Sequence, residues 1–147
     1  MTIILRDADE RDVIRCAELL SELQSATGSK QGPVIEDTFR ELLTKKRGQV
    51  VVAEKESLIL GMVSVSYNVA MRYGGEYCQL EELIVTPDAR GLNLGGLLVQ
   101  KVVDNAIARG CKEIGLYLVV TTEHNRSFYE KYGFESVGTE MRQRLSD

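Results

Sequence analysis

Residues 81–96, EELIVTPDARGLNLGG, join an apolar, β-rich segment to the start of a helix through a glycine-bearing loop. Backbone N–H groups at a helix start have no partner within the helix and present the positive end of the helix dipole. Such a loop suits an anion, and glycine lets a phosphate approach the backbone. The stretch has neither the G-K-[ST] of a P-loop nor the spacing G-x-G-x-x-G, which argues against the two commonest nucleotide motifs. An anion-binding loop and an ordinary strand-to-helix turn remain as alternatives.

The segments before this stretch predict a strand, two helices and an antiparallel meander. A short strand at residues 2–6 precedes an amphipathic helix that begins near Val13, with Asp9 as a candidate N-cap, and a second helix follows around residues 39–43. β-Branched and alternating residues then predict three consecutive strands joined by short turns, at residues 50–52, 58–67 and 76–86.

The segments after it complete a crossover. Apolar spacing predicts a helix from residue 94 that ends at Gly110, followed by a buried strand at 114–120, a short helix at 125–132 and a final strand or strand pair at 134–145. A strand, helix and strand in this order make the two strands parallel. The predicted fold class is therefore α/β (α+β), one domain over residues 1–147, with a mixed, mostly antiparallel central sheet flanked by helices.

The composition and the charge of the chain argue against several classes of protein. The 147 residues are 44% hydrophobic and 27% charged, which suits one packed domain. A net charge of -4 has the wrong sign for nucleic acid, and no apolar run approaches the roughly 20 residues that span a membrane, so we expect a cytoplasmic protein. Cys16, Cys78 and Cys111 share no C-x-x-C spacing and His124 is the sole histidine, so we expect reduced structural cysteines and no metal site.

A second segment, NRSFYEKYGF at residues 125–134, predicts a short helix that closes on Gly-Phe. With it, the chain resembles the GNAT superfamily of N-acetyltransferases. Residues 90–96 are similar to the motif Arg/Gln-x-x-Gly-x-Gly/Ala, residues 128–134 are similar to F-Y-x-x-x-G-F, and the order of elements agrees over nearly the whole chain. Asn93 replaces the first motif glycine, and Asn tolerates a positive φ better than most residues. Asn125 lies closer to Tyr129 than the family's Asn-x-x-Ala spacing gives.

The resemblance implies a GNAT-type domain with an acetyl-CoA site and no required metal. The pantetheine arm would pair, as an added strand, with the backbone of Leu83, Ile84 and Val85, where the parallel strands splay apart near Thr86 and Val120. Asn125 would also contact the cofactor. The pyrophosphate would be held by Arg90, Gly91, Leu92, Asn93, Leu94, Gly95 and Gly96.

The implied chemistry is direct transfer of an acetyl group from a thioester to an amine. An alkylamine, with a pKa of about 10.4, is protonated at neutral pH, so a general base is needed. Glu82 is the first candidate, and Glu81 is the alternative, expected on the opposite face of the strand. Tyr129, at the family's tyrosine position, would stabilise the departing thiolate. The structural alternatives are a solvated carboxylate pair and core packing of Tyr129.

We expect the acetyl group to go to the primary amine of a small molecule, and the sequence does not identify that amine. Residues 89–95 also resemble aminoalkylphosphonate N-acetyltransferases, and Lys30 or Arg72 could meet a phosphonate. A polyamine or a protein amino terminus would instead suit the acidic balance. A homodimer is a further expectation. The alternatives in other classes are a non-catalytic acyl-CoA-binding or regulatory module and an interaction domain that binds no CoA.

Overall fold

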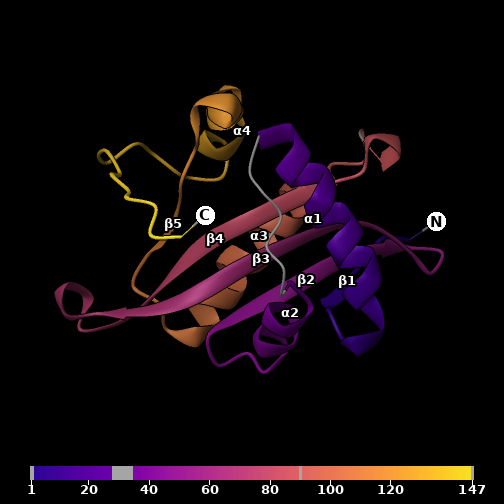
Figure 1. Cartoon of the computed structure of the whole chain (residues 1–147), viewed down its shortest axis with the longest axis horizontal. Coiled ribbons are helices and arrows are strands. Elements are labelled where there is room, and N and C mark those ends of the chain that lie inside the picture. The colour runs from indigo at the N-terminus through magenta and orange to yellow at the C-terminus, as the bar shows by residue number, and fades with distance from the viewer. Residues whose placement is uncertain (1, 28–34, 90, 147) are drawn as a thin grey trace.

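A computed structural model describes residues 2–27, 35–89 and 91–146 and contains one five-stranded sheet (Figure 1). The strands follow chain order across the sheet, and all neighbours are antiparallel except the last pair, which is parallel. The mixed, mostly antiparallel sheet and its parallel pair confirm the predicted fold class. The strands are β1 (Ile4–Asp7), β2 (Gly48–Lys55), β3 (Leu58–Ala70), β4 (Gly75–Val85) and β5 (Ile114–Leu116).

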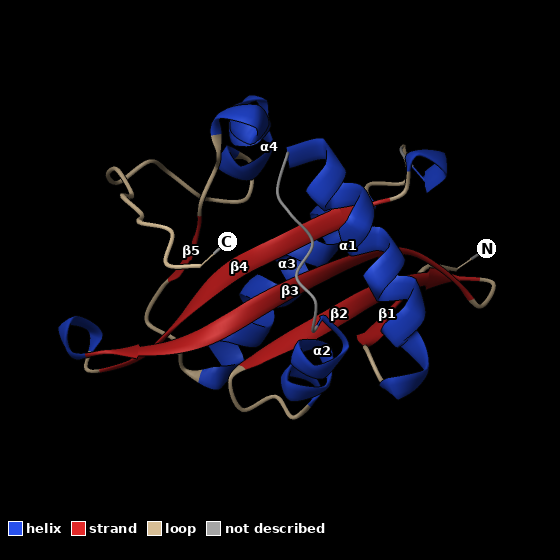
Figure 2. Cartoon of the chain, in the orientation of Figure 1, coloured by secondary structure: helices blue, strands red, loops and turns tan. Residues whose placement is uncertain are grey.

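Helices cover both faces of the sheet, with α1 and α2 in front of it and α3 behind it in Figure 2. The interior strand β2 therefore contains a continuous apolar run, in which the side chains of Val51 and Val52 lie on opposite faces and neither is exposed. One core joins α3 to Val51, Val63 and Val65, and the other joins α1 and α2 to Val52 and Met62. The helices are α1 (Val13–Thr27), α2 (Ile35–Leu43), α3 (Leu94–Arg109) and α4 (Arg126–Glu130).

An ionic cluster fixes the amino-terminal end. As expected, Asp9 is a helix cap, but it caps the short 3-10 turn Glu10–Asp12 that leads into α1. Asp12 is 3% exposed and accepts two hydrogen bonds from the Arg6 guanidinium, at 2.8 and 2.9 Å. Arg6 also donates to Glu54 on β2 at 2.9 Å. This cluster ties β1, β2 and the start of α1 together.

A β-bulge interrupts the pairing of β3 with β4. Ser64 lies opposite Glu82 while the next residue, Val65, lies opposite Leu80, so Glu81 is an extra residue in β4. The core facing α3 contains Leu80 before the bulge and Leu83 after it, so the inward side of β4 changes from even to odd residue numbers. An extra residue in one strand has this effect.

The carboxyl-terminal third differs from the sequence expectation. β5 covers only Ile114–Leu116, and its three residues are half-buried, so the expected buried strand over 114–120 was wrong. Val119 instead caps the 3-10 segment Val120–Asn125, and the Thr122 N–H donates to the Val119 carbonyl at 2.9 Å. The helix expected over residues 125–132 is shorter, at Arg126–Glu130.

Residues 134–146 form no strand, so the expected final strand or strand pair is also absent from the described chain. Val137 and Met141 are about nine-tenths exposed, at 87% and 91%. Thr139 stands between them, on the same face that a strand would present. Burying that face would also bury a hydroxyl group, which costs free energy unless the group finds a partner.

Candidate active site

The parallel strands β4 and β5, the last pair in the sheet, separate after a short pairing. The β4–β5 register begins at Cys78 and Ile114 and ends at Leu80 and Leu116, earlier than the expected point near Thr86 and Val120. Among the described residues, no strand pairs with β4 on this side beyond Leu80. The Thr86 N–H donates to the Leu60 carbonyl of β3 at 2.9 Å. Because successive residues alternate direction, the backbone groups of Leu83 and Val85 face the open edge, whereas those of Ile84 face β3.

The bulge places two carboxylates on one face. The Ser64 hydroxyl donates to Glu82, and the Ser66 hydroxyl donates to Glu81 at 2.6 Å. Ser64 and Ser66 share a face of β3 because they are two residues apart. The expectation that Glu81 points away from Glu82 was therefore wrong, since simple alternation does not hold across an extra residue. Glu82 is half-buried, whereas Glu81 is exposed.

Burial raises the pKa of Glu82 above its usual value. The hydrogen bond from Ser64 acts in the opposite direction, and the nearby charge of Glu81 adds to the increase. Ser64 itself is 2% exposed. Sequence reasoning missed its contact with Glu82, although a serine between two valines on a buried strand is a detectable signal. The result is a carboxylate that is more basic than one in water.

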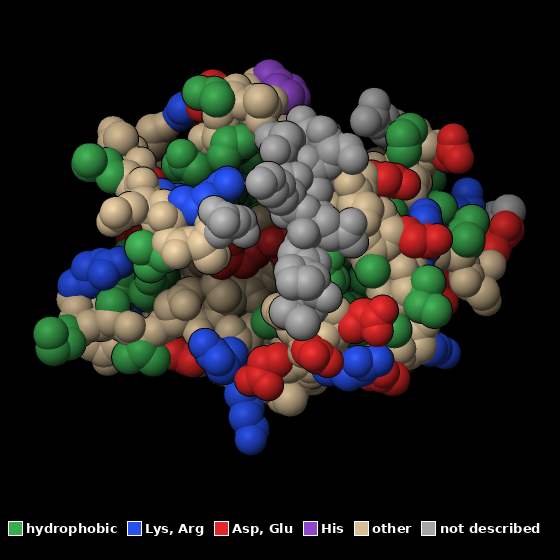
Figure 3. Space-filling view, viewed as in Figure 1, with side chains coloured by type: hydrophobic (Ala, Val, Ile, Leu, Met, Phe, Trp, Pro, Cys, Tyr) green, Lys and Arg blue, Asp and Glu red, His purple; other side chains and the backbone are tan. Residues whose placement is uncertain are grey.

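Glu82 reaches a pocket of about 260 Å³ between the sheet and the first two helices. Figure 3 shows this face, with acidic side chains at the bottom of a hollow near its middle. Among the described residues, the other polar groups in the pocket wall are Ser64 and Thr38. The remaining wall is apolar and consists of Cys16, Ala17, Leu20, Ile35, Phe39, Leu42, Val50 and Met62.

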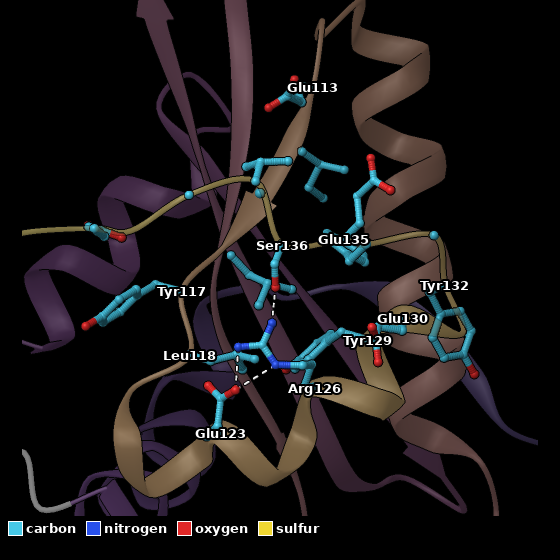
Figure 4. A pocket seen from close by; sticks show the side chains of 18 of the residues that line it. Glu113, Tyr117, Leu118, Glu123, Arg126, Tyr129, Glu130, Tyr132, Glu135 and Ser136 are labelled. Atoms are coloured by element: carbon cyan, nitrogen blue, oxygen red, sulfur yellow. Dashed lines mark hydrogen bonds and ion pairs between the residues drawn. The ribbon is translucent and has the colours of Figure 1, made fainter.

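Tyr129 lies on α4, in a different pocket. Its ring packs edge-to-face on Phe128 and Phe134, with ring centres 5.0 and 6.0 Å apart. Tyr129 therefore contributes to aromatic packing, which was the structural alternative for this residue. Burial raises the pKa of Tyr129. Its pocket, of about 910 Å³, lies between β5, α4 and residues 134–140 (Figure 4). Tyr129 and Glu82 therefore do not line one common cavity.

Arg126 makes polar contacts with two other residues that line this second pocket. Arg126 donates to Glu123 at 2.6 Å and also to the Ser136 hydroxyl, as the dashed lines in Figure 4 show. Asn125 precedes α4 in a helical conformation, and its side chain makes no capping hydrogen bond.

Two residues of the loop before α3 adopt a left-handed backbone conformation. Gly91 has φ 92°. Asn93, which stands where the motif has its first glycine, has φ 56°, so this asparagine adopts a left-handed conformation without being glycine. Leu97 makes the first helical bond, to the Asn93 carbonyl at 3.1 Å, which leaves the preceding N–H groups of the first turn without a helical acceptor. Leu92 is 42% exposed, whereas the side chain of Leu94 is buried in the core.

The two glycines of this turn are close to aromatic rings. A Cβ on Gly95 would lie 3.3 Å from the Phe128 ring, and one on Gly96 would lie 1.8 Å from the Tyr132 hydroxyl. The contact of Tyr132 was not expected from the sequence. Arg90 and Lys30 lie outside the described residues.

Other expected site features can be placed from the described residues. Arg72 stacks on Tyr73 and Tyr77, with its guanidinium 4.7 and 5.2 Å from the ring centres, and it does not line the Glu82 pocket. No cluster of three or more His, Cys, Asp or Glu side chains in the described part of the chain could hold a metal ion. None of the helices in that part is long and apolar enough to cross a membrane.

Residues 16–134 match the model of the acetyltransferase (GNAT) family. The chain belongs to this family. The match covers most of the chain and includes both motifs on which the sequence resemblance rests. This GNAT member therefore belongs to a family of acetyltransferase enzymes, as expected.

Three proteins illustrate what this GNAT chain is similar to. A glucosamine 6-phosphate N-acetyltransferase of Trypanosoma brucei brucei is 26% identical, over 94% of this chain and 92% of that protein. An uncharacterized N-acetyltransferase of Methanocaldococcus jannaschii is 28% identical over 66% of this chain, which spans only 43% of that protein. The crystal structure of a Trypanosoma brucei acetyltransferase has a TM-score of 0.80 at 25% identity, with 98% of this chain and all of that chain covered.

Proposed function

We propose that this chain, as a single domain, transfers the acetyl group of acetyl-CoA to the primary amine of a small molecule. The observation that carries the proposal is the position of Glu82. It is a half-buried carboxylate with a raised pKa, at a pocket and on the same strand as the open edge of β4. A base next to an added-strand site is the arrangement that this reaction needs.

The residues around α3 and β4 fit acetyl-CoA, which supplies the acetyl group as a thioester. The first-turn N–H groups of α3, at Leu94, Gly95 and Gly96, suit a pyrophosphate because they have no acceptor within the helix. The open backbone groups of Leu83 and Val85 suit the amides of a pantetheine arm. Arg90, Gly91, Leu92, Asn93 and Asn125 remain part of the proposed binding surface. The backbone of Ile84 faces β3, so the proposed pairing with pantetheine rests on Leu83 and Val85.

Glu82 acts on the amine. It accepts a proton from the ammonium group, directly or through a water, and the amine nitrogen then forms a bond to the acetyl carbon as the carbon–sulfur bond breaks. The sulfur leaves with the electron pair and takes the second proton of the nitrogen, while Glu82 returns its proton to solvent. The raised pKa of Glu82 favours the first transfer, because a stronger base captures the proton more readily.

Tyr129 acts on the sulfur. In the described part of the chain, the Tyr129 hydroxyl makes no hydrogen bond. Burial raises its pKa and keeps it protonated, so it is able to donate to a thiolate. Since its pocket differs from that of Glu82, this role requires the thioester to lie between the two, at the separated strands.

The test is CoA thiol release from acetyl-CoA with a panel of primary amines, measured from pH 6 to pH 10 on the wild-type chain and on Glu82→Gln. We expect the variant to lose most rate near neutral pH and least at high pH, where free amine is abundant. Equal loss at every pH would contradict the base role. CoA binding without thiol release from any amine would instead indicate a non-catalytic acyl-CoA-binding or regulatory module.

The panel includes glucosamine 6-phosphate, because the relative from Trypanosoma brucei brucei is named for that substrate. It also includes a peptide with a free amino terminus, which tests the alternative of protein acetylation. Cytoplasmic location and a homodimer belong to the same proposal, and sedimentation at several concentrations tests the dimer.

A further inference from the structure

We infer that the acceptor amine is carried on an apolar, unphosphorylated body about the size of a phenylalkyl group. This inference rests on the proposed function and names the substrate class of the same site. It follows from the shape, the lining and the charge of the pocket that Glu82 enters.

The described residues that line this pocket are mostly apolar. Its helix-borne wall includes Ala17 and Leu20 from α1 and Phe39 from α2, and its sheet-borne wall includes Val50 and Met62. Hydroxyl groups of a sugar would lie against these side chains without hydrogen-bond partners, and each such loss is costly. An aliphatic or aromatic group would instead bury its surface there.

The volume of the Glu82 pocket limits the size of the group that carries the amine. A cavity of roughly 150 Å³ lined by Leu, Ile and Phe holds one benzene molecule. The pocket beside Glu82 has about 260 Å³, so it has room for a ring and a short chain that ends in an amine. A ring at the apolar end would leave the amine close to Glu82 and Ser64, the polar groups contributed by the sheet.

The charges favour a cation over a phosphate. The Glu82 carboxylate lines the pocket and Glu81 is adjacent, whereas no Lys, Arg or His is among the described residues that line it. The arginines of α1 and α2 have other partners. Arg40 pairs with Glu10 at 2.7 Å, and Arg15 donates to the Ile59 carbonyl at 3.3 Å. A phosphate would therefore meet two carboxylates without a neutralising partner from this part of the chain.

The direct test compares kcat/KM for 2-phenylethylamine, hexylamine and glucosamine 6-phosphate in the thiol-release assay at saturating acetyl-CoA. We expect either apolar amine to exceed the sugar phosphate by about 100-fold or more, since unpaired polar groups cost more than a missing methylene. A preference for glucosamine 6-phosphate would overturn the inference and leave the proposed function intact. Binding of CoA with no release from any amine would overturn both.

Two matched variants of α1 test whether the amine substrate binds in the Glu82 pocket. Ala17→Phe fills the pocket from α1, whereas Ile14→Phe adds the same ring at a position that is 70% exposed on the same helix. We expect Ala17→Phe to raise the KM for 2-phenylethylamine by about tenfold or more with an unchanged Kd for CoA, and Ile14→Phe to change neither. An unchanged KM in Ala17→Phe would overturn the inference.

A second substitution keeps the test valid if Ala17→Phe does not fold. Leu20→Lys adds a cation at a half-buried position of the same wall. We expect it to weaken binding of 2-phenylethylamine, measured by calorimetry in the presence of CoA, by about tenfold. Unaltered amine affinity in a folded Leu20→Lys protein would place the amine elsewhere and overturn the inference.

Discussion

The hydroxyl of Tyr132 lies directly against Gly96 in the first turn of α3, so close that a methyl group on Gly96 would come 1.8 Å from it. The same hydroxyl is 3.5 Å from the Asn93 side-chain oxygen. Tyr132 follows α4, in the second sequence motif, and Gly96 ends the first. The two motifs therefore meet in space at the end of the helix proposed to hold the pyrophosphate.

Gly96→Ala is expected to force Tyr132 out of this position. Overpacking of this kind costs about 1–3 kcal/mol, and we expect a loss of CoA affinity of about tenfold or more, measured by calorimetry. Gly75→Ala is the control, since a Cβ there meets nothing within 4 Å. Adding Tyr132→Ala to Gly96→Ala should restore part of the affinity. If Gly96→Ala binds CoA as well as the wild type does, Tyr132 moves without cost.

Tyr129→Phe is expected to lower kcat by a factor of about 10²–10³, the usual effect of removing one preorganised donor, with a smaller change in CoA affinity. The ring and its contacts with Phe128 and Phe134 remain, so the comparison isolates the hydroxyl. Tyr117→Phe, in the same pocket but 39% exposed, is the matched control. Wild-type turnover in Tyr129→Phe, where chemistry limits the rate, would show that the hydroxyl is structural.

Glu82→Gln is expected to change how stability depends on pH. Because the pKa of Glu82 is raised in the folded chain, its contribution is fully present below the unfolded value of about 4.3 and is lost as pH rises through the folded value. Glutamine has no such loss, so the melting temperature of the variant, relative to wild type, should be higher at pH 8 than at pH 4. Glu56→Gln, on an exposed turn, is the control. A difference between Glu82→Gln and wild type that does not vary with pH would contradict the raised pKa.

Arg6→Ala is expected to destabilise the fold by about 3 kcal/mol, because it leaves the buried carboxylate of Asp12 without its partner. Burial alone would raise the pKa of Asp12, but the bonds from Arg6 and the Asp9 N–H hold it below its ordinary value. The stabilisation is therefore present above about pH 3.9 and is lost as pH falls through the lower folded pKa.

Denaturant melts at pH 7 and pH 2.5 measure this effect, and the gap between Arg6→Ala and wild type should narrow in acid. Arg11→Ala, which removes an exposed pair with Asp9, should cost less than about 1 kcal/mol at either pH. Equal losses in the two variants would mean that the Arg6 cluster behaves as a surface contact.

Local signals in the sequence predicted most of the fold. Gly110 ends α3 in the left-handed conformation, with φ 89°, and the parallel β4–β5 pair follows from the strand–helix–strand order. The extra residue at Glu81 was missed because a period of two was assumed throughout β4. The signal was present, since the apolar positions change from Cys78 and Leu80 to Leu83 and Val85.

Other parts of the site could not have been predicted from local patterns. The meeting of Tyr132 with Gly96 joins residues that are far apart in the chain, and no local periodicity encodes such a contact. The short β5 and the absent final strand depend on whether a neighbouring edge accepts them, and apolar content alone says little about that.

The extra residue in β4 has an effect on the shape of the sheet. A bulge increases the local twist of its strand, and here it begins at Glu81, the first residue beyond the last pairing of β4 with β5. The end of the β4–β5 pairing therefore coincides with the point where Glu81 and Glu82 come to share a face. We expect deletion of residue 81 to restore simple alternation along β4, which would leave a single carboxylate on this face.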